Sequence, residues 1–386
     1  MKKSLLALAV ASAAFVATSV SATPVYNKDG TTLDIGGRIE AMWMSGGEKA
    51  VNKNDSTIRN RARLNIAGRT QLTNGIAAYG FAEWQNQNVG KSDNGDGFNT
   101  RDQYVGVDFG KFGKVQAGRY EDPFQYASDV TDHFEEHGCM ALVGDERNSG
   151  KLSYLWSGYG VDAGVTAQFA ENSYDSDVLK AKDYKANVND GFSIFAGYTT
   201  PNVVFGPISI RAAYKYLDGQ RDSDTISPDL TIFKVGNLKG TNLGSFDHEK
   251  TWAAGLSWGT FKKGLYLAVD YTYDKVEFQD GTFDGNDLTT KAFESIISYG
   301  FDSGVVLSTG YQWRKQEIDK AAEGEYTDRA GKLVQFTVAY NINPNFRVWA
   351  EANIDAGSDD YYSLTKLKDD SKDAENFFDI GARYTF

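Results

Sequence analysis

The sequence predicts an all-β fold, a closed barrel of sixteen antiparallel strands that crosses a membrane. Three observations predict it: strand-length segments alternate apolar and polar residues, their connectors are alternately short and long, and the chain ends in an alternating strand with an aromatic last residue. Gly (40), Tyr (22) and Phe (23) are abundant whereas Pro (6) is scarce. This composition suits many strands joined by tight turns.

The last nine residues show the pattern most clearly. Phe378, Ile380 and Phe386 share one face, and Asp379 and Arg383 share the other. A water-soluble strand rarely ends a chain with its most apolar side chain exposed. In a membrane barrel the outer face contacts lipid and the terminal aromatic ring lies at the membrane interface.

The amino-terminal segment has the features of a secretory signal peptide, which we place at residues 1–22. Lys2 and Lys3 precede an apolar run, and the small residue Ala22 completes a cleavage pattern. Removing two lysines makes the exported chain more acidic than its formal net charge of -12 indicates. We see no linker after this segment, so residues 23–386 are predicted to form one barrel domain.

Sixteen alternating segments follow the signal peptide, an even number as single-chain bacterial barrels require. The predicted strands are 32–44, 57–72, 76–87, 101–109, 114–119, 149–156, 161–170, 191–199, 208–216, 250–258, 265–275, 291–300, 305–316, 332–342, 346–354 and 376–386. Their apolar faces should contact lipid. Past the signal, polar residues interrupt every apolar run before the ~18 residues that a membrane helix needs. A barrel of this size is too wide for side chains to fill, so its lumen holds water.

The second predicted strand carries a row of arginines. Arg59, Arg61 and Arg63 share one face, opposite apolar neighbours. Placing them toward lipid would cost about 2 to 4 kcal/mol each near the membrane midplane, so we expect them to face the lumen. Arg38 and Glu40 of the first strand face the lumen by the same alternation. One part of the inner wall is therefore predicted to be basic.

The long connector 120–147 is acidic, and its position can be interpreted in two ways. If it folds into the lumen, its carboxylates face the arginines across the opening, and the opposed charges filter solutes by size and charge. Alternatively it points outward and is solvated, like the other long connectors. Ahead of Gly138 its acidic residues are Glu121, Asp122, Asp129, Asp132, Glu135 and Glu136.

Short motifs along the mature chain give it a family resemblance. They are Val25–Gly30, Leu33–Arg38, Ala62–Leu64, Tyr79–Gly80, Phe109–Gly110, Gly118–Arg119 and Arg383–Phe386. Together they make the chain similar to the general trimeric porins of Gram-negative outer membranes. The resemblance implies an outer-membrane homotrimer in contact with lipid and lipopolysaccharide. It also implies passive diffusion of small hydrophilic solutes and ions, and a third external loop that folds into the barrel.

The resemblance also implies a constriction site. Arg38, Arg63, Arg101 and Arg147 fall where the family has its basic wall, and Arg59 and Arg61 extend that wall. The chain departs from the enteric pattern at the loop tip, so the acid that faces the pore stays open among Asp132, Glu135 and Glu136. The predicted acidic loop residues are Asp129, Asp132, Glu135 and Glu136, with Glu83 as a further lumen acid.

Other functions find less support. The chain has three histidines, none in a convincing nucleophile or base constellation, so no enzyme activity is expected. We expect no cofactor and no nucleic-acid partner. His133 and His137 lack a third metal ligand, although either imidazole would make conductance modestly pH-dependent. The alternative function is a substrate-specific sugar or anion channel, which should show an aromatic ladder or a lysine track along the lumen.

Two further expectations concern assembly and selectivity. Ala78, Gly80 and Ala82 form a face of small residues that permits close contact with another subunit. The acidic loops should raise the cation concentration at the mouth of the channel, whereas the arginines oppose this effect. We expect mild cation selectivity.

Overall fold

A computed structural model describes most of the chain after the predicted signal peptide. The described residues are 23–45, 56–89, 97–136, 147–174, 186–220, 245–279, 285, 287–318, 328–357, 362–363, 366–367 and 376–386. The predicted signal peptide and His137 lie outside them. No helix in the described part of the chain is both long and apolar enough to cross a membrane.

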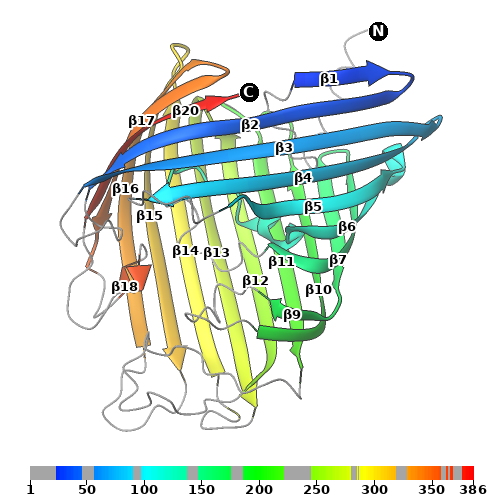
Figure 1. The fold of residues 1–386 in the computed structure, drawn as a ribbon. Helices are drawn as coiled ribbons and strands as arrows, with labels where there is room; N and C mark the ends of the chain where they lie inside the picture. Colours follow the sequence, from blue (N-terminus) through cyan, green and yellow to red (C-terminus); the bar gives the residue numbers. More distant parts are fainter. Residues whose placement is uncertain are drawn as a thin grey trace.

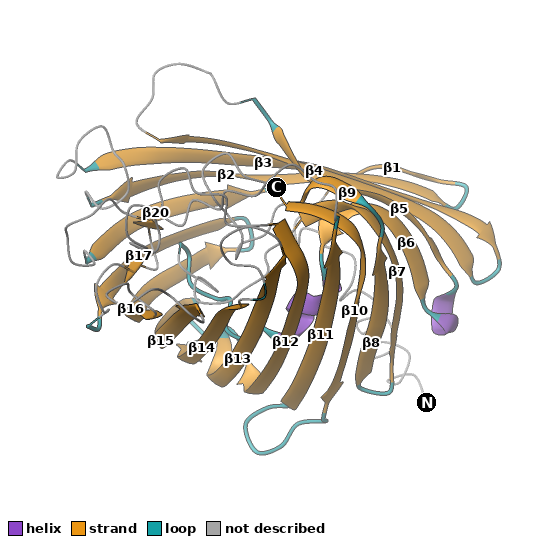
Figure 2. Ribbon diagram, turned by 90° about the horizontal axis from the view of Figure 1, so that it is seen from below, coloured by secondary structure: helices purple, strands orange, loops and turns teal. Residues whose placement is uncertain are grey.

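The predicted sixteen-stranded antiparallel barrel is confirmed (Figures 1 and 2). Its strands are β2 (Thr31–Met44), β3 (Thr57–Thr73), β4 (Ile76–Val89), β5 (Asn99–Asp108), β6 (Lys114–Glu121), β7 (Arg147–Gly158), β8 (Val161–Gln168), β10 (Ala186–Thr199), β11 (Ile208–Gly219), β12 (Ser245–Thr260), β13 (Lys263–Gln279), β14 (Asp287–Gly300), β15 (Val305–Ile318), β16 (Asp328–Asn343), β17 (Phe346–Asp355) and β20 (Phe377–Thr385). Each pairs with the next, and β20 pairs with β2 to close the ring. Closure leaves no unpaired edge for lipid to meet.

Four short strands were not predicted. β9 (Glu171–Tyr174) extends the pairing of β8 with β10, and β18 (Tyr362–Ser363) forms a small hairpin with β19 (Lys366–Leu367). β1 (Thr23–Lys28) pairs with the first residues of β2, on the edge that β20 covers further along. β1 and β20 thus share one edge of β2, and Phe386 exchanges backbone hydrogen bonds with Gly37.

The alternating faces separate lipid from lumen as the sequence predicts. On β20 the outward Ile380 is 59% exposed, whereas the adjacent Asp379 is 1% exposed. Aromatic side chains near the rim donate hydrogen bonds to turn carbonyls: Tyr154 Oη of β7 donates to the Phe112 carbonyl. This arrangement is typical of membrane-interface residues, whose rings are apolar and whose tips are polar.

The acidic connector after β6 runs inside the barrel. Its first turn is the short helix η2 (Pro123–Ala127), which lies beside β11 within the ring of strands (Figure 2). Phe124 and Ala127 are buried on the inner wall against Leu155, Phe195, Ala213 and Ala253. Further along, Val130 and Phe134 are buried against Tyr266, Ala268 and Ile296. The inward position of this loop is therefore confirmed, and we call residues 121–136 the lumen loop.

Candidate pore constriction

The tip of the lumen loop is bound to the barrel wall by ion pairs. Glu135 Oε1 lies 2.6 Å from Arg347 Nη1 on β17, and Glu135 Oε2 lies 2.7 Å from Arg383 Nη2 on β20. Glu136 Oε1 contacts Arg59 Nη2 on β3 and lies 3.3 Å from Arg61 Nη2. Two adjacent carboxylates thus connect the tip to three wall strands.

Backbone hydrogen bonds support the same attachment. The Glu351 carboxylate on β17 accepts the backbone N–H of Glu135 at 2.8 Å and that of Glu136 at 3.3 Å. Thr337 Oγ1 donates to Glu351 Oε2 at 2.8 Å. Hydrogen bonds to a charged acceptor are stronger than neutral ones, so Glu351 fixes the tip backbone as well as orienting its side chains.

Glu40 of β2 lies at the centre of the wall arginines. Arg61 Nε donates to its carboxylate at 2.5 Å and Arg383 Nε donates at 2.7 Å, while Arg38 Nε lies 4.0 Å away. The Glu40 side chain is 1% exposed. These contacts join wall and tip into one charge-balanced cluster, which we call the tip network: Glu40, Glu135, Glu136, Glu351, Arg59, Arg61, Arg347 and Arg383.

A second basic group lies on the wall next to the tip network. Glu83 Oε1 lies 2.9 Å from Arg101 Nε and 3.7 Å from Arg63 Nη1. Gln85 Oε1 also accepts a hydrogen bond from Arg63 Nε at 2.6 Å. One carboxylate shared between two guanidinium groups leaves an excess of positive charge at this part of the wall.

The acids in the middle of the lumen loop have a different environment. Asp129 and Asp132 are exposed, whereas their neighbours Val130 and Thr131 are 2% and 1% exposed against the wall. Thr131 Oγ1 donates to Glu294 of β14 at 3.1 Å and also contacts Asp270. Asp129 and Asp132 are therefore the solvent-accessible acids of this segment.

Comparison with known proteins identifies the family of this chain. A family model described as Gram-negative porin matches residues 4–319. The chain belongs to the Gram-negative porin family. It is 28% identical to outer membrane protein U of Vibrio vulnificus over the whole length of both chains. The protein is accordingly a non-enzymatic diffusion channel of the outer membrane.

Two solved structures show that the fold is shared. OmpF of Salmonella typhi, in complex with daunomycin, superimposes with a TM-score of 0.71 at 17% identity, covering 94% of this porin and 100% of that chain. The trimer form of OmpT of Vibrio cholerae superimposes with a TM-score of 0.62 at 17% identity, covering 93% of this porin and 100% of that chain.

His133 connects the porin's lumen loop to a turn between strands. Its ring stacks on Phe261, in the β12–β13 turn, with centroids 3.8 Å apart and planes 7° apart, and it meets Tyr266 edge-on at 5.3 Å. Burial lowers the pKa of His133 to about 4, and the positive charge of Lys262 adds to this effect. The imidazole is therefore neutral near pH 7 and acts as a packing ring.

The structure brings the predicted site residues together in three groups. Arg59, Arg61, Glu135 and Glu136 meet in the tip network, with Arg38 beside it. Arg63, Arg101 and Glu83 form the second group. Arg147 lies at the root of the loop, where its Nη2 is 2.8 Å from Glu121 Oε2 and its Nε is 3.5 Å from Asp102 Oδ1.

One expectation about the tip differs from the structure. Glu135 and Glu136 were expected to face the arginines across an opening, but they contact them directly. Sequence reasoning also omitted Arg347 and Glu351. Both lie on the inward face of strand 346–354, and the alternation that located Arg59 and Arg61 would have located them too.

Proposed function

We propose that this porin filters small hydrophilic solutes and ions at an opening between the lumen loop and the arginine wall. Asp129 and Asp132 supply the negative side, and Arg38, Arg63 and Arg101 supply the positive side. One observation carries the proposal: Glu135 and Glu136 fix the loop to the wall, and Asp129 and Asp132 are exposed. Opposed charges across a narrow opening create a transverse field.

The arginines that we propose to meet solute are somewhat more exposed than those that attach the loop. The side chains of Arg38, Arg63 and Arg101 are 22%, 20% and 20% exposed. By contrast, the Arg59 side chain is 4% exposed and has Glu136 as a partner. Because several wall arginines are neutralised in this way, the wall opposes cations less than its number of arginines indicates. With a formal net charge of -12 on the chain, we expect mild cation selectivity.

Reversal potentials in a salt gradient test the proposed filter. Replacing both Asp129 and Asp132 with Asn should abolish the cation preference and move selectivity toward anions, while the barrel stays folded. A matched control replaces two carboxylates in exposed turns outside the lumen, Asp29 and Asp302, with Asn. If the two double variants have the same reversal potential, Asp129 and Asp132 do not line the ion path.

A substrate-specific sugar channel is the second candidate, and the aromatic residues argue against it. Trp349 is 3% exposed, and its Nε1 donates to Asp379 at 2.8 Å. Trp313 is the register partner of Lys332 on the outward face of β15. Tyr79 and Phe81 do face inward but are 7% and 5% exposed. Liposome swelling with sugars of increasing size should therefore show a graded cutoff; saturable uptake of one sugar would favour the second candidate.

We further propose a homotrimer whose subunits meet at the outward face of β4. Ala78, Gly80 and Ala82 permit close approach, and a Cβ added to Gly80 would have only the Tyr104 carbonyl within 4 Å, at 3.8 Å. Light scattering in detergent should give a trimer for the native chain and a monomer for Gly80→Arg. A trimer that persists in this variant would place the interface elsewhere.

The export and lipid environment of the chain complete the proposal. Residues 1–22 are removed during export, and the barrel lies in a bilayer whose outer leaflet contains lipopolysaccharide. Mass spectrometry of the outer-membrane protein should give a chain that starts at residue 23. Retention of lipopolysaccharide through purification would support the lipid contact.

A further inference from the structure

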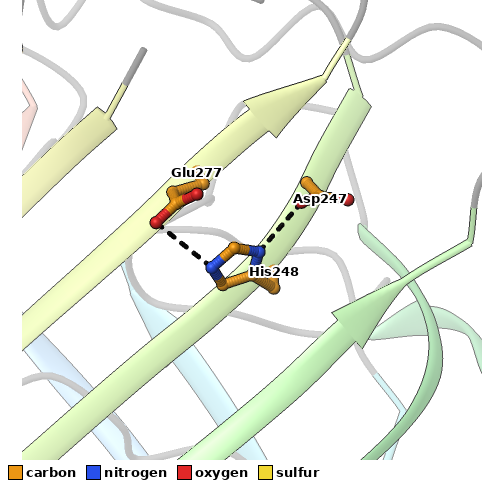
Figure 3. A group of neighbouring side chains, drawn as sticks. All are labelled: Asp247, His248 and Glu277. Carbon is orange, nitrogen blue, oxygen red and sulfur yellow. Dashed lines mark hydrogen bonds and ion pairs between the residues drawn. The ribbon is translucent and has the colours of Figure 1, made fainter. Parts of the chain in front are cut away.

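A charged cluster lies outside the lumen, at the long-loop ends of β12 and β13 (Figure 3). It consists of Asp247, His248 and Glu277, and one ligand atom from each lies within 4.8 Å of the others. His248 alternates in phase with Trp252, which is 42% exposed on the outward face. The cluster therefore faces away from the conduction path.

A β-bulge assembles this cluster. His248 on β12 is the register partner of Glu277 on β13, so the two side chains lie side by side. The register shifts between Phe246 and His248, and a bulge re-aims a neighbouring side chain. Asp247, which strict alternation would point to the opposite face, instead has Oδ2 2.9 Å from His248 Nδ1.

The hydrogen bonds orient the imidazole toward a cation. When Nδ1–H donates to Asp247, the lone pair of Nε2 faces Glu277 Oε1 at 3.2 Å. Lys250 Nζ lies 2.8 Å from the same Nε2 and 3.9 Å from Glu277 Oε1. An ammonium group therefore occupies the place where a nitrogen and a carboxylate oxygen converge. A carboxylate that holds the second ring nitrogen is the usual support of a metal-binding histidine.

We propose that this cluster binds a first-row divalent transition metal ion such as Zn²⁺. His248 Nε2 and a Glu277 oxygen are the protein ligands, Asp247 orients the ring, and water completes the coordination. Imidazole with carboxylate suits zinc, copper and nickel. The side chains of His248, Glu277 and Asp247 are 15%, 32% and 37% exposed, so an ion can reach them from solvent.

Binding requires the ion to displace the Lys250 ammonium, and the surrounding charges permit this. Lys275 also lies 3.3 Å from Glu277, but its Nζ has a second partner in Asp287 at 2.7 Å. Lys275 therefore keeps an ion pair when the metal takes Glu277. Lys250 competes directly with the metal for Nε2, so its removal should strengthen binding.

Zinc titration of the full-length folded porin in detergent, by competition with a chromophoric indicator at fixed pH, tests the proposal. The chain has three histidines, which makes the control direct. His248→Gln should abolish binding, whereas the double variant His133→Gln with His137→Gln should keep it. Asp247→Asn should weaken binding about tenfold, the usual effect of losing such a supporting carboxylate. Lys250→Gln should tighten it severalfold.

Other outcomes would overturn the proposal. Unchanged affinity in His248→Gln, or loss of binding in the loop double variant, would place the ion elsewhere. No saturation below about 1 mM Zn²⁺ would leave the cluster as a surface ion-pair network only. Conductance gives an independent readout, because an outward ion should not change it. A zinc block that disappears in the loop double variant would instead locate the ion in the lumen. Circular dichroism of each variant confirms that the barrel is folded.

Discussion

The lumen loop contacts the barrel wall in two regions that differ in physical character. Its root, residues 122–134, is held mainly by apolar packing: Phe124 and Ala127 are 1% and 0% exposed against β7, β10, β11 and β12. Its tip, Glu135 and Glu136, is held by ion pairs with β3, β17 and β20. Apolar burial depends little on ionic strength, whereas charge pairs are weakened by salt, though less so where they are buried as at this tip. The root should therefore hold the loop against the wall, and the tip should affect mainly the charge selectivity of the channel.

The first polar residue of the root, Asp122, has its charge well supported. Burial raises the pKa of Asp122, but Lys151, Ser193 and the backbone N–H of Phe124 hold it below its usual value. Asp122 therefore stays ionised and caps η2, accepting the Phe124 N–H at 2.9 Å and the Ser193 hydroxyl at 2.6 Å. This cap begins the helix that places Phe124 on the wall.

Among the variants of root and tip, Phe124→Ala should have the largest effect on how firmly the lumen loop is held to the wall. Truncating a buried phenylalanine lowers stability by about 3 to 5 kcal/mol. Here the loss should weaken the packing of the lumen loop against the wall. The loop should leave the wall more often, so that single-channel conductance and the size cutoff both rise. Phe301→Ala is the matched control, because Phe301 is 45% exposed in a turn outside the lumen. Equal conductance in the two variants would mean that the root does not hold the loop.

The tip should respond less in conductance and more in selectivity. Replacing Glu135 and Glu136 together with Gln removes hydrogen bonds to charged groups worth about 1.5 to 3 kcal/mol each in a typical case. It also leaves Arg59, Arg347 and Arg383 without these carboxylate partners. Reversal potentials should shift toward anions.

A salt series distinguishes the two regions. Raising the ionic strength should shift the native porin part of the way toward the tip variant, because screening weakens the same ion pairs but acts less on buried ones. It should not reproduce the effect of Phe124→Ala. If high salt raises the conductance of the native porin as much as Phe124→Ala does, beyond the rise in bulk conductivity, then charge also holds the root.

The barrel was predictable because lipid and water impose a period of two on every strand. That period located Arg59 and Arg61 on the inner face, since an arginine toward lipid is costly. The period of two did not reveal which arginines lie close enough to share a carboxylate. Arg61 and Arg383 are far apart in the chain and share Glu40 only because β20 closes the ring against β2. Glu135 and Glu136 lie in a loop without a period, so their contacts depend on tertiary packing.

The smallest effect we expect is a pH dependence at the boundary between root and tip. His133 has a pKa of about 4 in the seated loop, whereas a released imidazole has one near 6.5. Above pH 6.5 both forms are neutral, so pH does not change the seating. As pH falls from about 6.5 to about 4, His133 binds a proton when the loop is released but stays neutral when the loop is seated. The released form is therefore increasingly favoured, and the loop is held less firmly to the wall. Conductance should be steady from pH 8 to 6.5 and should rise or become noisier below that.

His133→Phe isolates this effect from carboxylates that titrate in the same range. A phenyl ring keeps the stack on Phe261 and carries no proton, so the variant should respond less than the native porin between pH 6.5 and 4. His137→Gln is the companion variant, because it removes the other histidine of connector 120–147 and leaves the His133–Phe261 stack unchanged. If the native porin and His133→Phe follow the same curve, the acid response comes from carboxylates of the tip network. In that case pH would act on the tip alone, and the root would be insensitive to pH as well as to salt.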